Sequence, residues 1–148
     1  MKSMLTLTLL VMVPWMIGGC RKTAIHQQRI HEDGIYRGVF IDGDSIQINV
    51  EFVLQDGIVQ EVSFRHLRRD DDYHLHATEE PYRSVIQQYQ EALNHLVGKK
   101  IETHLRDLYT PQEIVNTQVD GYTAATLRSN KILSAIRDGL NRGVYSYP

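Results

Sequence analysis

The sequence predicts an α+β domain in which helices pack on one face of an antiparallel β-sheet. Three observations lead to this prediction: apolar and polar residues alternate from Ile46 to Leu54, an Asp56-Gly57 pair follows, and two later stretches repeat apolar residues at spacings of three and four. Alternation with a period of two is typical of a strand with one buried face, and the longer spacing is typical of amphipathic helices. Strands followed by helices favour an α+β domain.

The strands come first in the chain. We expect one strand at Tyr36–Ile41 and a second at Ile46–Leu54. Because an Asp-Gly pair accepts the positive φ angles of a tight hairpin, Gln55–Gly57 is predicted to turn the chain into a third strand. The residues of that strand expected to face the core are Ile58, Val62 and Phe64. Gln60 breaks the alternation, and the prediction is an antiparallel hairpin with one face in water.

Two amphipathic helices are predicted after the strands. The first carries apolar residues at helical spacing from Tyr82 to Val97. Pro81 suits its first turn and Gly98 its C-terminal cap. The second helix is expected after Ser129, with Gly143 beyond its end. The apolar residues along one side of that helix are Ile132, Leu133, Ile136 and Leu140.

The N-terminal region has the composition of an export signal. Lys2 precedes an uncharged run, Met4–Gly19, and the run ends at Cys20, the only cysteine in the chain. A positive end, a short apolar run and small residues at a boundary are typical of secretory signals. Ile17-Gly18-Gly19-Cys20 also resembles the lipobox of bacterial lipoproteins, in which the cysteine is lipidated. An uncleaved N-terminal helix with an incidental cysteine is the alternative.

The lipoprotein interpretation divides the chain into three parts. We expect residues 1–19 to be a lipoprotein signal peptide, 20–35 a polar tether that holds the protein to a membrane through a lipid on Cys20, and 36–148 a single functional domain. The 148 residues, 42% of them hydrophobic, suit one globular domain. The formal charge of −2 argues against nucleic acid as a partner, since a phosphate backbone requires a basic excess.

An acidic, histidine-bearing loop between the strands and the first helix invites a metal hypothesis. Asp70-Asp71-Asp72 is followed by His74 and His76. Consecutive carboxylates in a loop often diverge instead of converging on one ion, and no third soft ligand stands nearby in the sequence. We therefore expect a solvated surface loop without a metal site.

The segment that points most strongly to chemistry is 120–129, Asp-Gly-Tyr-Thr-Ala-Ala-Thr-Leu-Arg-Ser, directly before the last predicted helix. Small side chains let the backbone approach an anion closely, and the N–H groups and dipole of a helix start favour a phosphate. Threonine and serine are also ordinary helix N-caps. On the residues alone, a plain capped helix start explains the segment as well as a phosphate site does.

This segment resembles the flavinylation motif of the FMN-binding domain family, Asp-x-x-Ser/Thr-Gly-Ala-Thr. The family includes the FMN-carrying subunits of the sodium-translocating NADH–quinone reductase and Rnf complexes, and exported electron-transfer lipoproteins. The positions that match the motif or the residues after it are Asp120, Thr123, Ala125, Thr126, Leu127 and Ser129. Ala124 stands where glycine is usual. The predicted order of hairpin and helices also follows the family.

The resemblance implies a function for the mature chain. In the family, a flavin transferase joins FMN through a phosphoester to the threonine that corresponds to Thr126. Asp120 would serve recognition by the transferase, and the residues adjoining the cofactor would be Thr123, Ala124, Ala125 and Leu127. The protein would be an electron carrier in the cell envelope, outside the cytoplasm, rather than an enzyme that turns over a substrate. Its redox partner is not identified by the sequence.

Two other functions stay open at this point. One is a non-redox envelope binding or scaffold lipoprotein that retains the fold without flavin, for which Ala124 is the main argument. The other is a metal- or haem-binding envelope protein that uses His74 and His76, although the chain has no Cys-x-x-Cys-His haem attachment.

Overall fold

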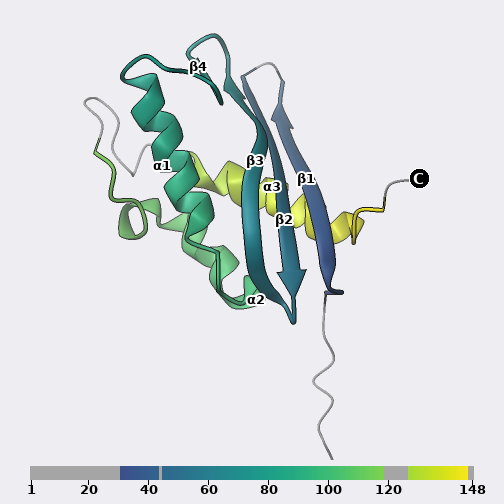
Figure 1. The fold of residues 1–148 in the computed structure, drawn as a ribbon. Coiled ribbons are helices and arrows are strands. Elements are labelled where there is room, and N and C mark those ends of the chain that lie inside the picture. The colour runs from purple at the N-terminus through teal and green to yellow at the C-terminus, as the bar shows by residue number, and fades with distance from the viewer. Residues whose placement is uncertain (1–30, 44, 119–126, 147–148) are drawn as a thin grey trace, which may run out of the picture.

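The computed structural model describes residues 31–43, 45–118 and 127–146, with the side chain of Tyr73 excepted (Figure 1). Its sheet contains β1 (Gly34–Asp42), β2 (Ile46–Gln55), β3 (Ile58–Arg69) and the short β4 (Tyr73–His74), paired antiparallel in the order β1-β2-β3-β4. The sheet therefore runs as a simple meander in which sequence neighbours are also neighbours in space.

The predicted hairpin is confirmed. Asp56 and Gly57 connect β2 to β3 with φ angles of 54° and 73°, the positive values that an Asp-Gly turn accepts. Along β2 alternate residues from Ile46 to Leu54 are buried, and the residues between them, Val53 included, are half-buried on the opposite face. Tyr36 of β1 lies opposite Phe52 of β2, and their rings stack with centroids 5.2 Å apart. Both rings belong to the hydrophobic core, which packs against this face of the sheet.

Two register shifts change the phase of β3 relative to the prediction. Leu54 pairs with Val59 whereas Phe52 pairs with Val62, so β3 has one more residue than β2 between these pairs. Such a bulge reverses which residues face the core. Val59 is accordingly buried, Ile58 is only half-buried, and the predicted core position of Ile58 is wrong. The bulge also explains why Gln60 breaks the alternation.

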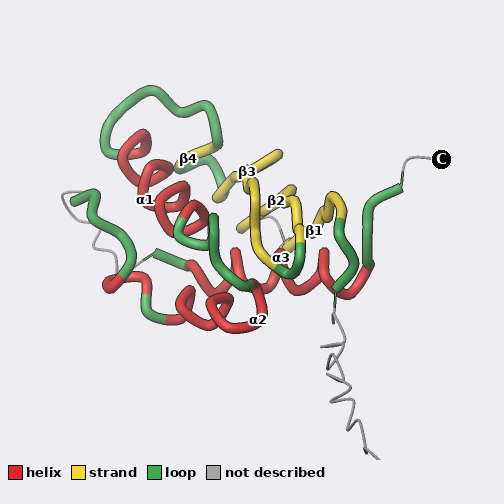
Figure 2. The backbone as a smooth tube through the Cα atoms, turned by 60° about the horizontal axis from the view of Figure 1, so that its bottom comes forward, coloured by secondary structure: helices red, strands yellow, loops and turns green. Residues whose placement is uncertain are grey.

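The helices cover one face of the sheet, which confirms the α+β fold predicted from the sequence. α1 (Tyr82–Asn94) packs beside β3, where Tyr89 meets Phe64 edge-on, and α3 (Ser129–Arg142) crosses β1 and β2 (Figure 2). α1 ends earlier than predicted, at Asn94, because the chain turns there so that Val97 and Lys100 form bridges with the start of β3.

Two glycines allow α3 to lie directly on β1. A Cβ atom on Gly38 would stand 1.9 Å from the carbonyl oxygen of Ala135 and 2.5 Å from the backbone nitrogen of Gly139. A Cβ on Gly139 would meet Phe52 and the β1 backbone at 3.1–3.2 Å. Backbone atoms of helix and strand thus touch without intervening side chains, and this contact sets the position of α3 on the sheet.

Between α1 and the motif segment lie three short helices that the sequence analysis did not predict. They are α2 (Ile101–His104) and the 3₁₀ helices η1 (Leu105–Tyr109) and η2 (Pro111–Glu113). Ile101, Leu105 and Leu108 bury their side chains in the common core, as does Val115 further along. This stretch fills the space between α1 and α3 beside the sheet.

Candidate functional site

Most of the residues singled out by the motif lie outside the described part of the chain. These are Asp120, Thr123, Ala124, Ala125 and Thr126, together with the lipidation candidate Cys20. Leu127 is described, and it belongs to the hydrophobic core with 7% of its surface exposed. The structure therefore shows how the chain enters and leaves segment 119–126.

Residues 116 and 117, which form the entrance to segment 119–126, are held by two polar side chains of α1. Glu91 accepts hydrogen bonds from the backbone N–H groups of Asn116 at 2.8 Å and Thr117 at 3.0 Å through one carboxylate oxygen, and from the hydroxyl of Thr117 through the other. Gln88, which is buried, donates its Nε2 to the carbonyl oxygen of Thr117 at 3.0 Å. Residues 116 and 117 are thereby attached to α1.

The charge of Glu91 is stabilised by these contacts. Burial acts to raise the pKa of its carboxyl group, but the hydrogen bonds donated by Thr117 and Asn116 outweigh burial, and the pKa lies below its usual value. A carboxylate that accepts several N–H and O–H bonds is held in its ionised form. Glu91 is consequently ionised at neutral pH, and as an anion it binds the N–H and O–H groups of residues 116 and 117.

The exit from the segment is held by the core and by η1. Leu127 is buried, and the hydroxyl of Ser129 donates to the carbonyl oxygen of Leu108 in a fully buried contact. Arg128 is the N-cap residue of α3 and makes no side-chain capping bond. The ordinary threonine or serine N-cap considered from the sequence is therefore wrong, because the Ser129 hydroxyl is used for packing against η1.

The N-terminus of α3 has electrostatic features that suit an anion. Its first turn contains no acidic residue, and Arg128 is exposed beside it. The first turn of any α-helix also leaves backbone N–H groups without intrahelical acceptors, and the helix dipole places partial positive charge there. A phosphate next to this end would meet positive potential without a competing carboxylate in the turn.

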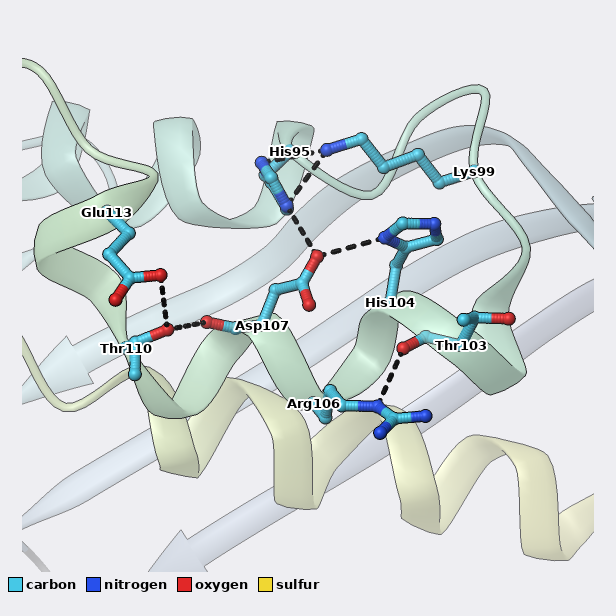
Figure 3. Close-up of polar contacts among 8 residues, drawn as sticks. All are labelled: His95, Lys99, Thr103, His104, Arg106, Asp107, Thr110 and Glu113. Atoms are coloured by element: carbon cyan, nitrogen blue, oxygen red, sulfur yellow. Dashed lines mark hydrogen bonds and ion pairs between the residues drawn. The ribbon is translucent and has the colours of Figure 1, made fainter.

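A cluster around Asp107 attaches η1 to the C-terminal end of α1 (Figure 3). One carboxylate oxygen of Asp107 lies 2.9 Å from Nε2 of His95 and 3.0 Å from Nδ1 of His104. Nζ of Lys99 lies within 3.0 Å of the His95 ring nitrogens. Because an ammonium only donates, a ring nitrogen of His95 is the acceptor for Lys99.

The cluster has a clear electrostatic consequence for Asp107. The hydrogen bond from His95 contributes most to lowering the pKa of the carboxyl group, the bond from His104 adds to this, and burial opposes it. The sequence does not indicate that His95 and His104 lie together, because they belong to different elements and neither forms a recognisable spacing with a third ligand. Their partner Asp107 lies in an unpredicted 3₁₀ helix.

The acidic loop is joined to β3 by ion pairs. Asp71 lies 3.3 Å from Nη2 of Arg68, and Asp72 lies 3.7 Å from Nη1 of Arg69. Nδ1 of His74 accepts the backbone N–H of His76 at 3.2 Å. Within residues 31–43, 45–118 and 127–146, no three histidine, cysteine or acidic side chains are grouped so that they could hold a metal ion.

The described residues include no helix long and apolar enough to cross a membrane. Comparisons with protein-family models, curated proteins and solved structures yield no match for this chain.

Proposed function

We propose that this protein is an exported, lipid-anchored electron carrier that holds FMN through a phosphoester on Thr126. The observation that carries the proposal is the Asp120–Thr126 motif placed immediately before α3. The absence of an acid from the first turn of α3 and the exposed Arg128 support a phosphate at this position. Bound FMN would supply the redox chemistry, and the chain would supply attachment and orientation.

Attachment requires an activated flavin nucleotide and a transferase. A bond forms between the Thr126 hydroxyl oxygen and the flavin phosphorus, while the phosphoanhydride bond of the activated nucleotide breaks and its nucleotide part leaves. The hydroxyl proton passes to a base of the transferase. Asp120 suits transferase recognition better than phosphate contact, because two negative groups repel each other. Lipidation at Cys20 would hold the carrier at the membrane near its redox partner.

The experiment is mass spectrometry of the tryptic peptide 107–128 from protein produced together with a flavin transferase. We expect the wild-type peptide to gain the mass of FMN less one water. Thr126→Ala should abolish the modification, and Thr126→Ser should retain part of it because the hydroxyl survives. Thr110→Ala is the matched control, since it removes a threonine from the same peptide, outside the motif, and leaves the acceptor intact. Unmodified wild-type peptide, or flavin that persists in Thr126→Ala, would contradict the proposal.

A non-redox envelope lipoprotein is the second candidate, and Ala124 is the observation that favours it. Where the family position adopts positive φ, alanine costs about 1 kcal/mol relative to glycine. Ala124→Gly separates the candidates. If an unmodified wild-type chain gains flavin on this single change, the chain has the family's attachment site in an impaired form. If neither chain is modified, the non-redox function is favoured.

A further inference from the structure

The arginines of the described residues fall into two groups according to their partners. Most of them form ion pairs with carboxylates: Arg37 and Arg65 with Glu51, Arg68 with Asp71, Arg69 with Asp72, Arg83 with Glu80, and Arg142 with Asp138. Arg106, Arg128 and Arg137 are exposed and form no ion pair within the part of the chain that the structure describes. All three belong to η1 or to α3 and its N-cap.

These side chains gather where η1 packs on α3. Side chains three residues apart in a 3₁₀ helix stand on the same face, so Arg106 and Tyr109 share one face of η1. Nη1 of Arg137 donates to the hydroxyl oxygen of Tyr109 at 3.4 Å, which joins this face to the middle of α3. Arg128 stands beside Ser129, whose hydroxyl bonds to η1. We call Arg106, Tyr109, Arg128 and Arg137 the arginine surface.

The chain itself does not neutralise the charge of the arginine surface. From Arg128 to Arg137 the sequence contains no acidic residue. Asp107 of η1 extends toward His95 and His104, while Arg106 points to the opposite side of η1 (Figure 3). Glu102 precedes Arg106 by four residues and forms no ion pair with it. The three guanidinium groups are therefore available to carboxylates from outside the chain.

The residue types of this surface favour a protein over a membrane. Tyr109 is 57% exposed, and tyrosine and arginine are the types that contribute most to binding at protein interfaces. The planar fork of a guanidinium also matches a carboxylate. Binding to lipid requires a face of several apolar side chains. Of the large hydrophobic residues exposed in the described chain, Tyr109 alone lies on this surface.

We propose that the arginine surface docks an acidic segment of a partner protein, and that this partner exchanges electrons with the chain. The second part rests on the proposed function, whereas the docking itself does not. Electron-transfer encounters are weak and bury little area, and opposite charges raise the rate of encounter. Arg128 follows the proposed acceptor Thr126 by two residues, so the partner docks beside the end of α3 at which the flavin is attached.

The test measures binding of a fluorescein-labelled octaglutamate peptide by fluorescence anisotropy. The full chain is used in non-ionic detergent, produced without a flavin transferase. We expect saturable binding with Kd below about 1 mM at about 20 mM salt. At about 200 mM salt the affinity should fall at least about fivefold, because salt screens exposed charges. An octalysine peptide should not bind. Absence of saturable octaglutamate binding, or an affinity that salt does not change, overturns the proposal.

Substitutions locate the binding on the chain. Arg106→Gln and Arg137→Gln should each weaken octaglutamate binding about threefold, and the double variant about tenfold. Arg83→Gln is the matched control, because it removes the same charge from an exposed arginine of α1 that is paired with Glu80 at 2.6 Å. It should keep the affinity within about twofold. Equal losses in all three single variants would show that net charge alone matters, and would overturn the proposal.

Two comparisons separate this surface from a membrane site and from flavin attachment. Flotation compares neutral vesicles with vesicles that contain phosphatidylserine. A preference for the anionic vesicles that the double variant loses, with unchanged peptide affinity, assigns the surface to lipid and overturns the proposal. If octaglutamate binds as expected while Thr126 gains no flavin, the docking surface stands and the electron-carrier function fails. If Thr126 gains flavin and the peptide does not bind, the docking surface alone is wrong.

Discussion

Glu91→Ala tests how the entrance to the motif segment is held. The change removes the acceptor of two backbone N–H groups, at 2.8 and 3.0 Å, and of the Thr117 hydroxyl. A hydrogen bond to a charged group contributes about 1.5–3 kcal/mol. Asn116 is exposed, so water replaces part of this loss. We expect the free energy of unfolding to fall by about 2–3 kcal/mol in total, and the melting temperature to fall by roughly 10 °C.

Thermal unfolding followed by circular dichroism measures the effect, with two further variants for comparison. Glu91→Gln keeps an oxygen that can accept the backbone N–H groups without the charge, so it should cost only about 1 kcal/mol. Glu102→Ala removes the same side chain at an exposed position where it has no hydrogen-bond partner among the described residues, and it should change stability by less than about 0.5 kcal/mol. Wild-type melting of Glu91→Ala would show that these bonds do not hold the entrance.

The same carboxylate predicts a pH dependence. The pKa of Glu91 is lowered in the folded protein from its ordinary value of 4.5. A lowered folded pKa means that the stabilisation is fully present above the unfolded pKa and is lost as pH falls through the folded one. The stability difference between wild type and Glu91→Gln should therefore shrink as pH falls from about 5 to about 3. A difference that stays constant over this interval would refute the assignment.

Two further changes test the anchor and the contact between helix and sheet. Cys20→Ala should release the protein from the membrane fraction, whereas unchanged retention would indicate an uncleaved spanning helix. Gly38→Ala should cost at least about 3 kcal/mol in unfolding experiments, because its Cβ would stand 1.9 Å from a backbone oxygen that cannot move alone. Gly43→Ala, with φ of 53° but open space around the new Cβ, should cost only about 1 kcal/mol; equal costs would contradict the role of this contact.

The hairpin could be predicted because its signals are local. Alternation along β2 and the positive φ angles at Asp56 and Gly57 depend on neighbouring residues alone. The phase of β3 could not be predicted in the same way. Val59 replaces Ile58 in the core because of a bulge, and a bulge depends on how two strands pair.

The short helices before the motif have a local signal in the sequence. Ile101, Leu105 and Leu108 follow one another at spacings of four and three, which is a helical pattern. Their contacts with other elements were not available from that pattern. The Asp107 cluster joins residues of η1, α2 and α1, and no periodicity indicates that two histidines meet one carboxylate.

The contacts made by two polar residues of α1 could not be predicted from the sequence either. Gln88 and Glu91 occupy positions that an amphipathic pattern assigns to solvent, yet Gln88 is buried and Glu91 binds the backbone of residues 116–117. Backbone N–H and carbonyl groups in an irregular segment need partners as much as those of helices do. Side chains supply them here, and the sequence does not show which ones.

The described contacts connect both sides of segment 119–126 to one packed body. Glu91 attaches residues 116–117 to α1, Asp107 attaches η1 to α1, and Ser129 attaches the start of α3 to η1. The separation between the two attachment points is therefore set by α1, η1 and α3, and does not depend on residues within the segment. It follows that Ala124→Gly and Thr126→Ala should each change the free energy of unfolding by no more than about 1 kcal/mol, so that differences in flavin loading report the chemistry of attachment. A large loss of stability in either variant would show that the segment itself holds α3 in place.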